Sequence, residues 1–149
     1  MLYIGVDLGT SAVKLLLMDG SGRIHKVVSR EYPLYFPHPA WSEQNPEDWF
    51  TASMDGMKEL TSECDKSQVA GISFGGQMHG LVTLDQADEV IRPAILWNDG
   101  RSEKETDYLN QTIGKEKLSA YTANIAFTGF TAPKTVSYTH LRAHETDSY

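Results

Sequence analysis

Three short apolar runs separated by tight turns open the chain. They extend from Leu2 to Asp7, from Ala12 to Met18 and from Arg23 to Tyr32. Glycine, serine and aspartate fill the second turn, Asp19-Gly20-Ser21-Gly22, as is typical of a reverse turn. We therefore predict three consecutive antiparallel strands. Because the first two runs are apolar at almost every position, we expect both faces of this sheet to be covered.

The hydrophobic pattern changes to helical spacing after a proline-rich loop over residues 33–46. Asn45 is a good N-cap, Pro46 suits the first helical position, and two acidic residues follow where the helix dipole favours them. A helix is therefore predicted from Pro46 onward. Its expected buried face comprises Phe50, Met54, Met57, Leu60 and Cys64.

Strand and helix patterns then alternate along the rest of the chain. Strands are predicted at Val69–Phe74, Leu81–Leu84 and Val90–Trp97, and helices at Arg101–Ile113 and Lys115–Tyr121. An antiparallel meander followed by alternating helices and strands predicts a mixed α/β fold.

Composition and charge exclude several classes of protein. The 149 residues, of which 40% are hydrophobic and 22% charged, are typical of one folded domain. A formal net charge of −7 argues against a nucleic-acid partner, which would need a basic surface. No fully apolar run is longer than that from Leu15 to Met18, which is far too short for a membrane helix, and a single cysteine, Cys64, excludes an intrachain disulfide. We expect a cytoplasmic protein without a membrane partner.

The first candidate for chemistry is the turn that follows the first strand, residues 7–11. Gly9 lets the backbone turn sharply near a ligand, and Thr10 and Ser11 add hydroxyls beside free backbone N–H groups, which suits phosphate oxygens. Asp7 could hold Mg²⁺ directly or through water. Lys14 offers a positive charge but could equally face solvent. An ordinary hairpin that happens to use these residues explains the spacing equally well.

A second candidate is Gly75-Gly76-Gln77-Met78-His79-Gly80, directly after a predicted strand. Ligands of α/β sheets gather beyond strand ends, and Gln77 and His79 can exchange hydrogen bonds with a polyhydroxylated molecule. Taken alone, a glycine-rich hairpin with a surface histidine is the simpler interpretation.

A third candidate is Trp97-Asn98-Asp99-Gly100-Arg101. Trp97 could form an apolar wall against a sugar ring, and Asp99 is an available polar group. The Asn-Asp-Gly sequence is also a turn by itself, so its polarity requires no function.

Taken in order, these motifs resemble the FGGY carbohydrate kinases, and within that family the bacterial xylulokinases. The matching stretches are Tyr3 to Ser11, Trp41 to Pro46 with Trp49, Gly76 to Gly80, Arg92 to Arg101, and Gly129 to Lys134. The resemblance implies an actin-like (ribonuclease H-like) ATPase fold, and ATP with Mg²⁺ as cofactors. The implied reaction phosphorylates the 5-hydroxyl of D-xylulose, and the family also allows a homodimer of a full-length protein.

The resemblance also implies roles for particular residues. Asp7 would organise magnesium and the phosphates, and the loop that follows it would bind them. Met78 and His79 would contact the sugar, with Trp97 walling its pocket. No carboxylate of this chain matches the family's general base, which is expected in a C-terminal part that this chain lacks. Two alternatives stay open: a kinase of the same family with another sugar or polyol, and a non-catalytic fragment.

The resemblance ends at Lys134. We predict an incomplete N-terminal kinase domain over residues 1–134 and a non-family tail over residues 135–149, either artefactual or disordered. The tail has β-branched residues where an apolar helix is expected, and it is similar to translated sequencing-adapter read-through. On this hypothesis His140 and His144 are not ligands.

Overall fold

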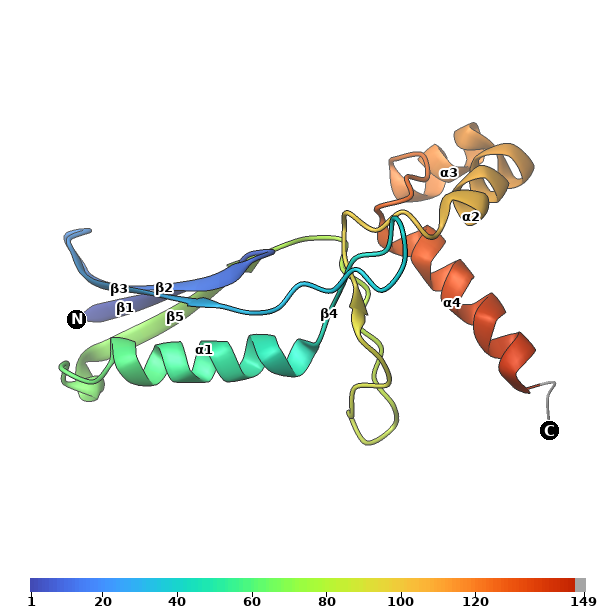
Figure 1. Ribbon diagram of the computed structural model, residues 1–149. Helices are drawn as coiled ribbons and strands as arrows, with labels where there is room; N and C mark the ends of the chain where they lie inside the picture. The colour runs from blue at the N-terminus through green and yellow to red at the C-terminus, as the bar shows by residue number, and fades with distance from the viewer. Residues whose placement is uncertain (147–149) are drawn as a thin grey trace. The chain divides into compact units, whose positions relative to one another are not determined.

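The computed structural model describes the backbone of residues 1–146 and the side chains of residues 1–139. It divides into two compact units (Figure 1). Unit 1 comprises Met1–Leu34 and Asn45–Gln77, and unit 2 comprises Tyr35–Gln44 and Met78–Tyr149. The sequence pattern did not predict this division. In the described part of the chain, no helix is both long enough and apolar enough to cross a membrane.

Unit 1 contains a four-stranded sheet in the order β3-β2-β1-β5. Strands β1 (Leu2–Leu8), β2 (Ala12–Asp19) and β3 (Ile24–Glu31) pair antiparallel, which confirms the predicted meander. Strand β5 (Val69–Gly76) pairs parallel with β1. The carboxyl ends of β1 and β5 therefore meet at one edge of the sheet, where the first two candidate motifs begin.

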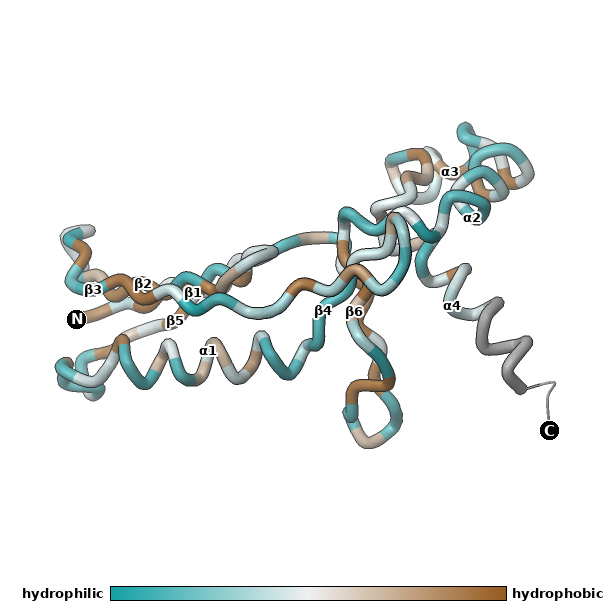
Figure 2. The backbone as a smooth tube through the Cα atoms, viewed as in Figure 1, coloured by the Kyte–Doolittle hydropathy of each residue, from teal (hydrophilic) through white to brown (hydrophobic). Residues whose placement is uncertain are grey.

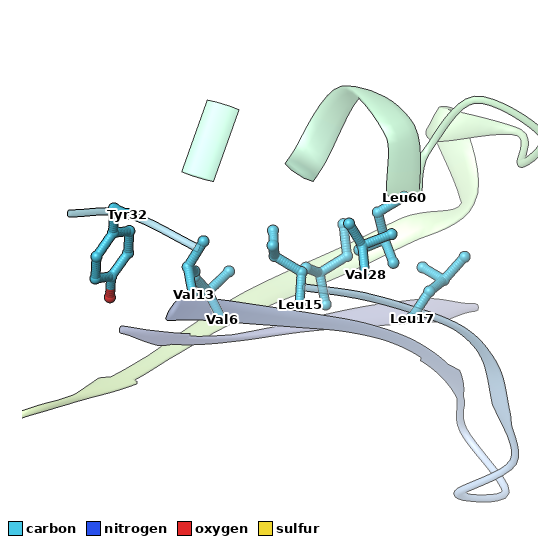
Figure 3. Packing of buried hydrophobic residues seen from close by; sticks show 8 residues of the cluster. Val6, Val13, Leu15, Leu17, Val28, Tyr32 and Leu60 are labelled. Carbon is cyan, nitrogen blue, oxygen red and sulfur yellow. The ribbon is translucent and has the colours of Figure 1, made fainter. Parts of the chain in front are cut away.

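Helix α1 (Pro46–Leu60) covers one face of this sheet. Its N-cap is Asn45, whose side chain accepts a hydrogen bond from the Glu47 N–H, as predicted. In Figure 3, Val6, Leu15 and Val28 point from the sheet toward the helix. Leu60 points from the helix into the same cluster.

The predicted apolar face of α1 is partly wrong. Phe50 and Met54 are exposed, because the helix is rotated so that Gly56 faces the sheet. A Cβ atom at Gly56 would lie only 2.5 Å from the Leu15 Cδ1 atom, so the glycine permits this close approach. Phe50 and Met54 instead line an apolar groove with Ile72.

The opposite face of the sheet is not covered by the described residues, so the expectation of two covered faces is wrong for this chain. Val27 is 59% exposed and Tyr3 39% exposed on that side. Burial alternates along β1 and β2, although most residues of both strands are apolar, as the brown segments of Figure 2 show. The uncovered face carries Asp7 and Lys14.

Unit 2 is built around a short two-stranded sheet. Strand β4 (Glu43–Gln44), inside the predicted proline-rich loop, pairs antiparallel with β6 (Ala94–Ile95). The strands predicted over 81–84 and 90–97 are otherwise wrong. Only isolated bridges join Leu81 to Ile95 and Leu84 to Val90 in these segments. Between them, the Asp85 carboxylate accepts hydrogen bonds from the Ala87 and Glu89 N–H groups and closes a turn.

Helices form the rest of unit 2. The helix predicted over 101–113 is α2 (Glu103–Tyr108) continued by the π-helix η2 (Leu109–Gly114). The next predicted helix is confirmed as α3 (Lys115–Thr122). Unit 1 also contains the 3₁₀ turn η1 (Lys66–Gln68).

Helix α4 (Thr131–Thr146) crosses the boundary predicted at residue 134. Residues 135–146 form the later turns of this helix. Ser137 is buried, and the Arg92 guanidinium lies 5.4 Å from the centre of the Tyr138 ring. That residues 135–149 are not family sequence stays a prediction. The side chains of His140 and His144, and residues 147–149, lie outside the described part.

Candidate functional site

The loop predicted to bind phosphate, residues 7–11 (the phosphate loop), closes the hairpin between β1 and β2 in unit 1. The Gly9 N–H donates a hydrogen bond of 3.0 Å to the Ala12 carbonyl. A Cβ atom at Gly9 would lie 3.1 Å from that same carbonyl oxygen, so a side chain here would crowd the turn. The backbone turns as tightly as the sequence predicted, and Ser11 is left exposed at its tip.

Asp7 and Lys14 are paired across β1 and β2, and both side chains are exposed. Across a β-ladder, directly paired residues lie on the same face of the sheet. They line a hollow of about 500 Å³ together with Ser73 and Gly75 of the neighbouring strand β5. Its lining also includes Gly5 and the apolar residues Leu16, Val27 and Phe74. The carboxylate and the ammonium group are the part of the hollow that suits a metal-bound phosphate.

Gln77 belongs to this part of the molecule. Its backbone N–H donates a 2.8 Å hydrogen bond to the Leu8 carbonyl, which prolongs the pairing of β5 with β1. The Thr10 hydroxyl donates to the Gln77 side-chain oxygen at 3.3 Å. These two contacts join Gln77 to residues 8 and 10 within unit 1. That Gln77 contacts a sugar stays a prediction.

Tyr32 is a residue of this site that sequence reasoning missed. It is buried at the end of β3, and its hydroxyl donates a hydrogen bond to the Gly9 carbonyl. Its backbone N–H donates to the Ser11 carbonyl at 3.3 Å, so one residue ties both sides of the loop. Burial, and secondly the Asp7 carboxylate, raise the pKa of Tyr32 to about 12, which keeps the hydroxyl protonated. Figure 3 shows the ring at one end of the core cluster.

Tyr32→Phe should therefore loosen the phosphate loop without disturbing the core. We expect the free energy of unfolding to fall by about 1 kcal/mol, the usual net contribution of one hydrogen bond. Hydrogen exchange at residues 9–11 should accelerate. Urea unfolding and exchange mass spectrometry of the 149-residue chain measure both effects. Tyr3→Phe, in the same unit but 39% exposed, is the matched control; equal effects of the two substitutions would contradict the assignment.

The pair predicted to contact the sugar, Met78 and His79 (the sugar-facing pair), lies in unit 2. Met78 is 69% exposed. His79 has a backbone φ of 61°, a left-handed conformation that non-glycine residues rarely adopt. Its ring stacks on the Phe130 ring, with centroids 4.0 Å apart and planes inclined by 12°. Sequence reasoning missed Phe130 as the partner of His79, because the contact joins segments about fifty residues apart.

Trp97 lies in the same unit and is 48% exposed. That its ring walls a sugar pocket stays a prediction. Its carbonyl packs against Gly129, where a Cβ atom would lie only 2.2 Å from the carbonyl oxygen. Gly129 directly precedes Phe130. The Trp97 backbone is therefore packed against the segment that carries the stacking partner of His79.

The expectation that Asp99 is an available polar group is wrong, because its carboxylate is engaged in contacts of the fold. Its side chain is fully buried and accepts hydrogen bonds from the Ser42 N–H at 2.6 Å and from the Arg101 side chain at 2.7 and 2.9 Å. Arg101 also pairs with Glu43 at 2.7 Å and lies 3.7 Å from the centre of the Trp41 ring. These contacts fasten the segment Tyr35–Gln44 to the rest of unit 2. A carboxylate engaged in this way has no oxygen left for a sugar.

The comparisons with known proteins agree with these motifs. Residues 2–148 match the model of the FGGY family of carbohydrate kinases, N-terminal domain. The chain is 40% identical over 146 residues to the xylulose kinase of Staphylococcus xylosus, covering 98% of this chain and 30% of that protein. It is 42% identical over 133 residues to the xylulose kinase of Klebsiella pneumoniae, covering 89% and 27%.

Comparison with solved structures also identifies sugar kinases as similar to this chain. The crystal structure of a xyloylose kinase from Brucella ovis superposes with a TM-score of 0.89 and 42% identity, covering 97% of this chain and 30% of that one. Matches to sugar kinases confirm the predicted actin-like, mixed α/β fold class. The chain thus spans about 30% of the length of its relatives. The family match includes the predicted tail, whereas the Klebsiella pneumoniae alignment covers 133 residues.

Proposed function

The chain belongs to the FGGY family of carbohydrate kinases, and from this premise we propose that it supplies the phosphate loop and part of the sugar site of an ATP-dependent ketose kinase. The proposed reaction transfers the γ-phosphoryl group of ATP to the 5-hydroxyl of D-xylulose. The observation that carries the proposal is the hollow beside Asp7 and Lys14, which offers the charges that a bound nucleotide phosphate requires. The identity of the relatives supports D-xylulose over other sugars.

Mg²⁺ would bind in this hollow together with the phosphates of ATP, rather than through protein ligands alone. The described residues contain no group of three or more histidine, cysteine or acidic side chains able to hold a metal ion. Magnesium usually retains waters and is bound by one or two carboxylates together with substrate phosphates. Asp7 is the carboxylate that would hold it, directly or through water, and the ion would neutralise phosphate charge.

The remaining functions of the proposed kinase are assigned to the part of the relatives that this chain does not span. No carboxylate near Met78 and His79 is assigned as general base, since Asp99 is engaged in the fold. We place the base and the adenosine pocket in the remaining length. The isolated chain is accordingly proposed to be inactive, with weak sugar binding at most.

The test uses a hybrid kinase, in which the 133 aligned residues of the Klebsiella pneumoniae xylulose kinase are replaced by those of this chain. We expect the hybrid to phosphorylate D-xylulose in preference to ribulose, gluconate and glycerol, and the isolated chain to show no turnover. A coupled assay of ADP release measures both. A folded hybrid that prefers another sugar would overturn D-xylulose as substrate. Turnover by the isolated chain would overturn the assignment of the base to the missing part.

A further inference from the structure

Lys134 is a fully buried cation in the first turn of α4. Its relative exposure is 0%, and its ammonium group donates hydrogen bonds to the His79 carbonyl at 2.8 Å and to the Gly129 carbonyl at 2.7 Å. Neither the composition nor the helical pattern of the sequence singled out this residue. The two carbonyls belong to segments about fifty residues apart, so Lys134 joins them across unit 2.

Burying an ammonium group is costly, since it loses its water. Here that desolvation lowers the pKa of Lys134 to about 8. The Asp99 charge raises this pKa, and the Arg101 charge lowers it further. An apolar side chain would fill this space at a smaller cost. The arrangement is therefore explained by the two carbonyl groups that the amine binds, rather than by packing.

Of the two carbonyl groups, that of His79 belongs to a residue with a strained backbone. The φ of 61° at His79 strains a residue that carries a side chain, and such strain persists only where the surroundings fix it. Lys134 fixes the peptide oxygen, while the stacked Phe130 ring fixes the imidazole at a centroid distance of 4.0 Å. Because Lys134 also binds the Gly129 carbonyl, it holds the two stacking segments in one register.

We propose that Lys134 is a positioning residue for sugar binding: it holds the strained His79 backbone against the Phe130 segment, so that His79 and the exposed Met78 are presented in a fixed orientation. This inference rests on the proposed function, which assigns Met78 and His79 to the sugar. It adds a residue that lies outside the motif Met78-His79. On this proposal, the pair binds the sugar in the correct orientation only while the Lys134 amine fixes the His79 backbone.

The test is a kinetic comparison in the hybrid kinase. Lys134→Met keeps a long side chain but removes both hydrogen bonds. We expect the KM for D-xylulose to rise about tenfold or more, since small displacements of binding groups are costly, while the KM for ATP stays within about twofold. Lys58→Met, at an exposed lysine of α1, is the matched control and should leave both constants unchanged. Equal increases in the two KM values, or a loss of stability with an unchanged sugar KM, would overturn the proposal.

A second variant covers the case in which Lys134→Met does not fold. Phe130→Leu removes the stacking surface but leaves the buried amine in place, and it should also raise the sugar KM selectively. An unchanged sugar KM in this variant would overturn the proposal.

Hydrogen exchange on the 149-residue chain separates this inference from the proposed function, because it requires no kinase activity. In Lys134→Met, exchange at residues 78–80 should accelerate while residues 9–12 stay unchanged. If the unmodified hybrid phosphorylates no sugar, the proposed function fails. If exchange at residues 78–80 does not respond to Lys134→Met, the inference fails.

Discussion

Asp99→Ala should lower the free energy of unfolding by about 3–5 kcal/mol, the usual cost of removing one partner of a buried ion pair. The Arg101 side chain is only 3% exposed and would lose its 2.7 Å contact with the Asp99 carboxylate. The Ser42 N–H would lose its acceptor as well. Glu43 would remain as a partner of Arg101, which places the expected cost nearer the lower end of the range.

Urea unfolding of the 149-residue chain measures this loss. Asp107→Ala, at an exposed position of α2, is the matched control and should change the free energy of unfolding by less than about 0.5 kcal/mol. Asp99→Ala combined with Arg101→Met should recover part of the loss, because the buried Arg101 charge is then removed and Glu43 keeps its 3.4 Å ion pair with Arg92. A loss below about 1 kcal/mol for Asp99→Ala, with sugar binding impaired, would return Asp99 to the ligand site.

Asp7→Asn should lower kcat of the hybrid kinase by about 10²–10³-fold, comparable with the loss of one preorganised charge-stabilising group. The substitution preserves the size of the side chain and removes its charge. Phosphoryl transfer depends on positioning and on neutralising phosphate charge, so a carboxylate that organises Mg²⁺ contributes mainly in the transition state. The Mg²⁺ concentration needed for half-maximal activity should rise as well.

The matched control for this prediction is Asp55→Asn, an exposed carboxylate of α1 whose ion pair with Lys58 is 3.1 Å long. Initial rates at varied ATP and Mg²⁺ measure both variants. Unchanged kcat and unchanged Mg²⁺ dependence in Asp7→Asn would exclude Asp7 from the phosphate site.

The sequence predicted what depends on local chemistry. The hairpin strands β1 to β3, the Asn45 cap of α1 and the tight turn at Gly9 all follow from residues that are neighbours along the chain. The pattern could not predict the β4–β6 pairing, because two-residue strands carry too little periodicity and depend on the distant contacts of Asp99 and Arg101. The rotation of α1 that turns Gly56 toward the sheet could likewise not be predicted, because it depends on the contact with Leu15 of the facing strand.

The candidate site divides in the same way. The sequence by itself predicted the phosphate loop and the Met78-His79 pair as candidates, because their glycines, hydroxyls and polar groups are contiguous in motifs. Only the tertiary structure assigned Asp99 to the fold, and only it identified Tyr32 and Lys134 as the residues that hold these motifs. The physical reason is that a buried hydrogen bond is made by residues distant in sequence, so neither partner carries a local signal of the other.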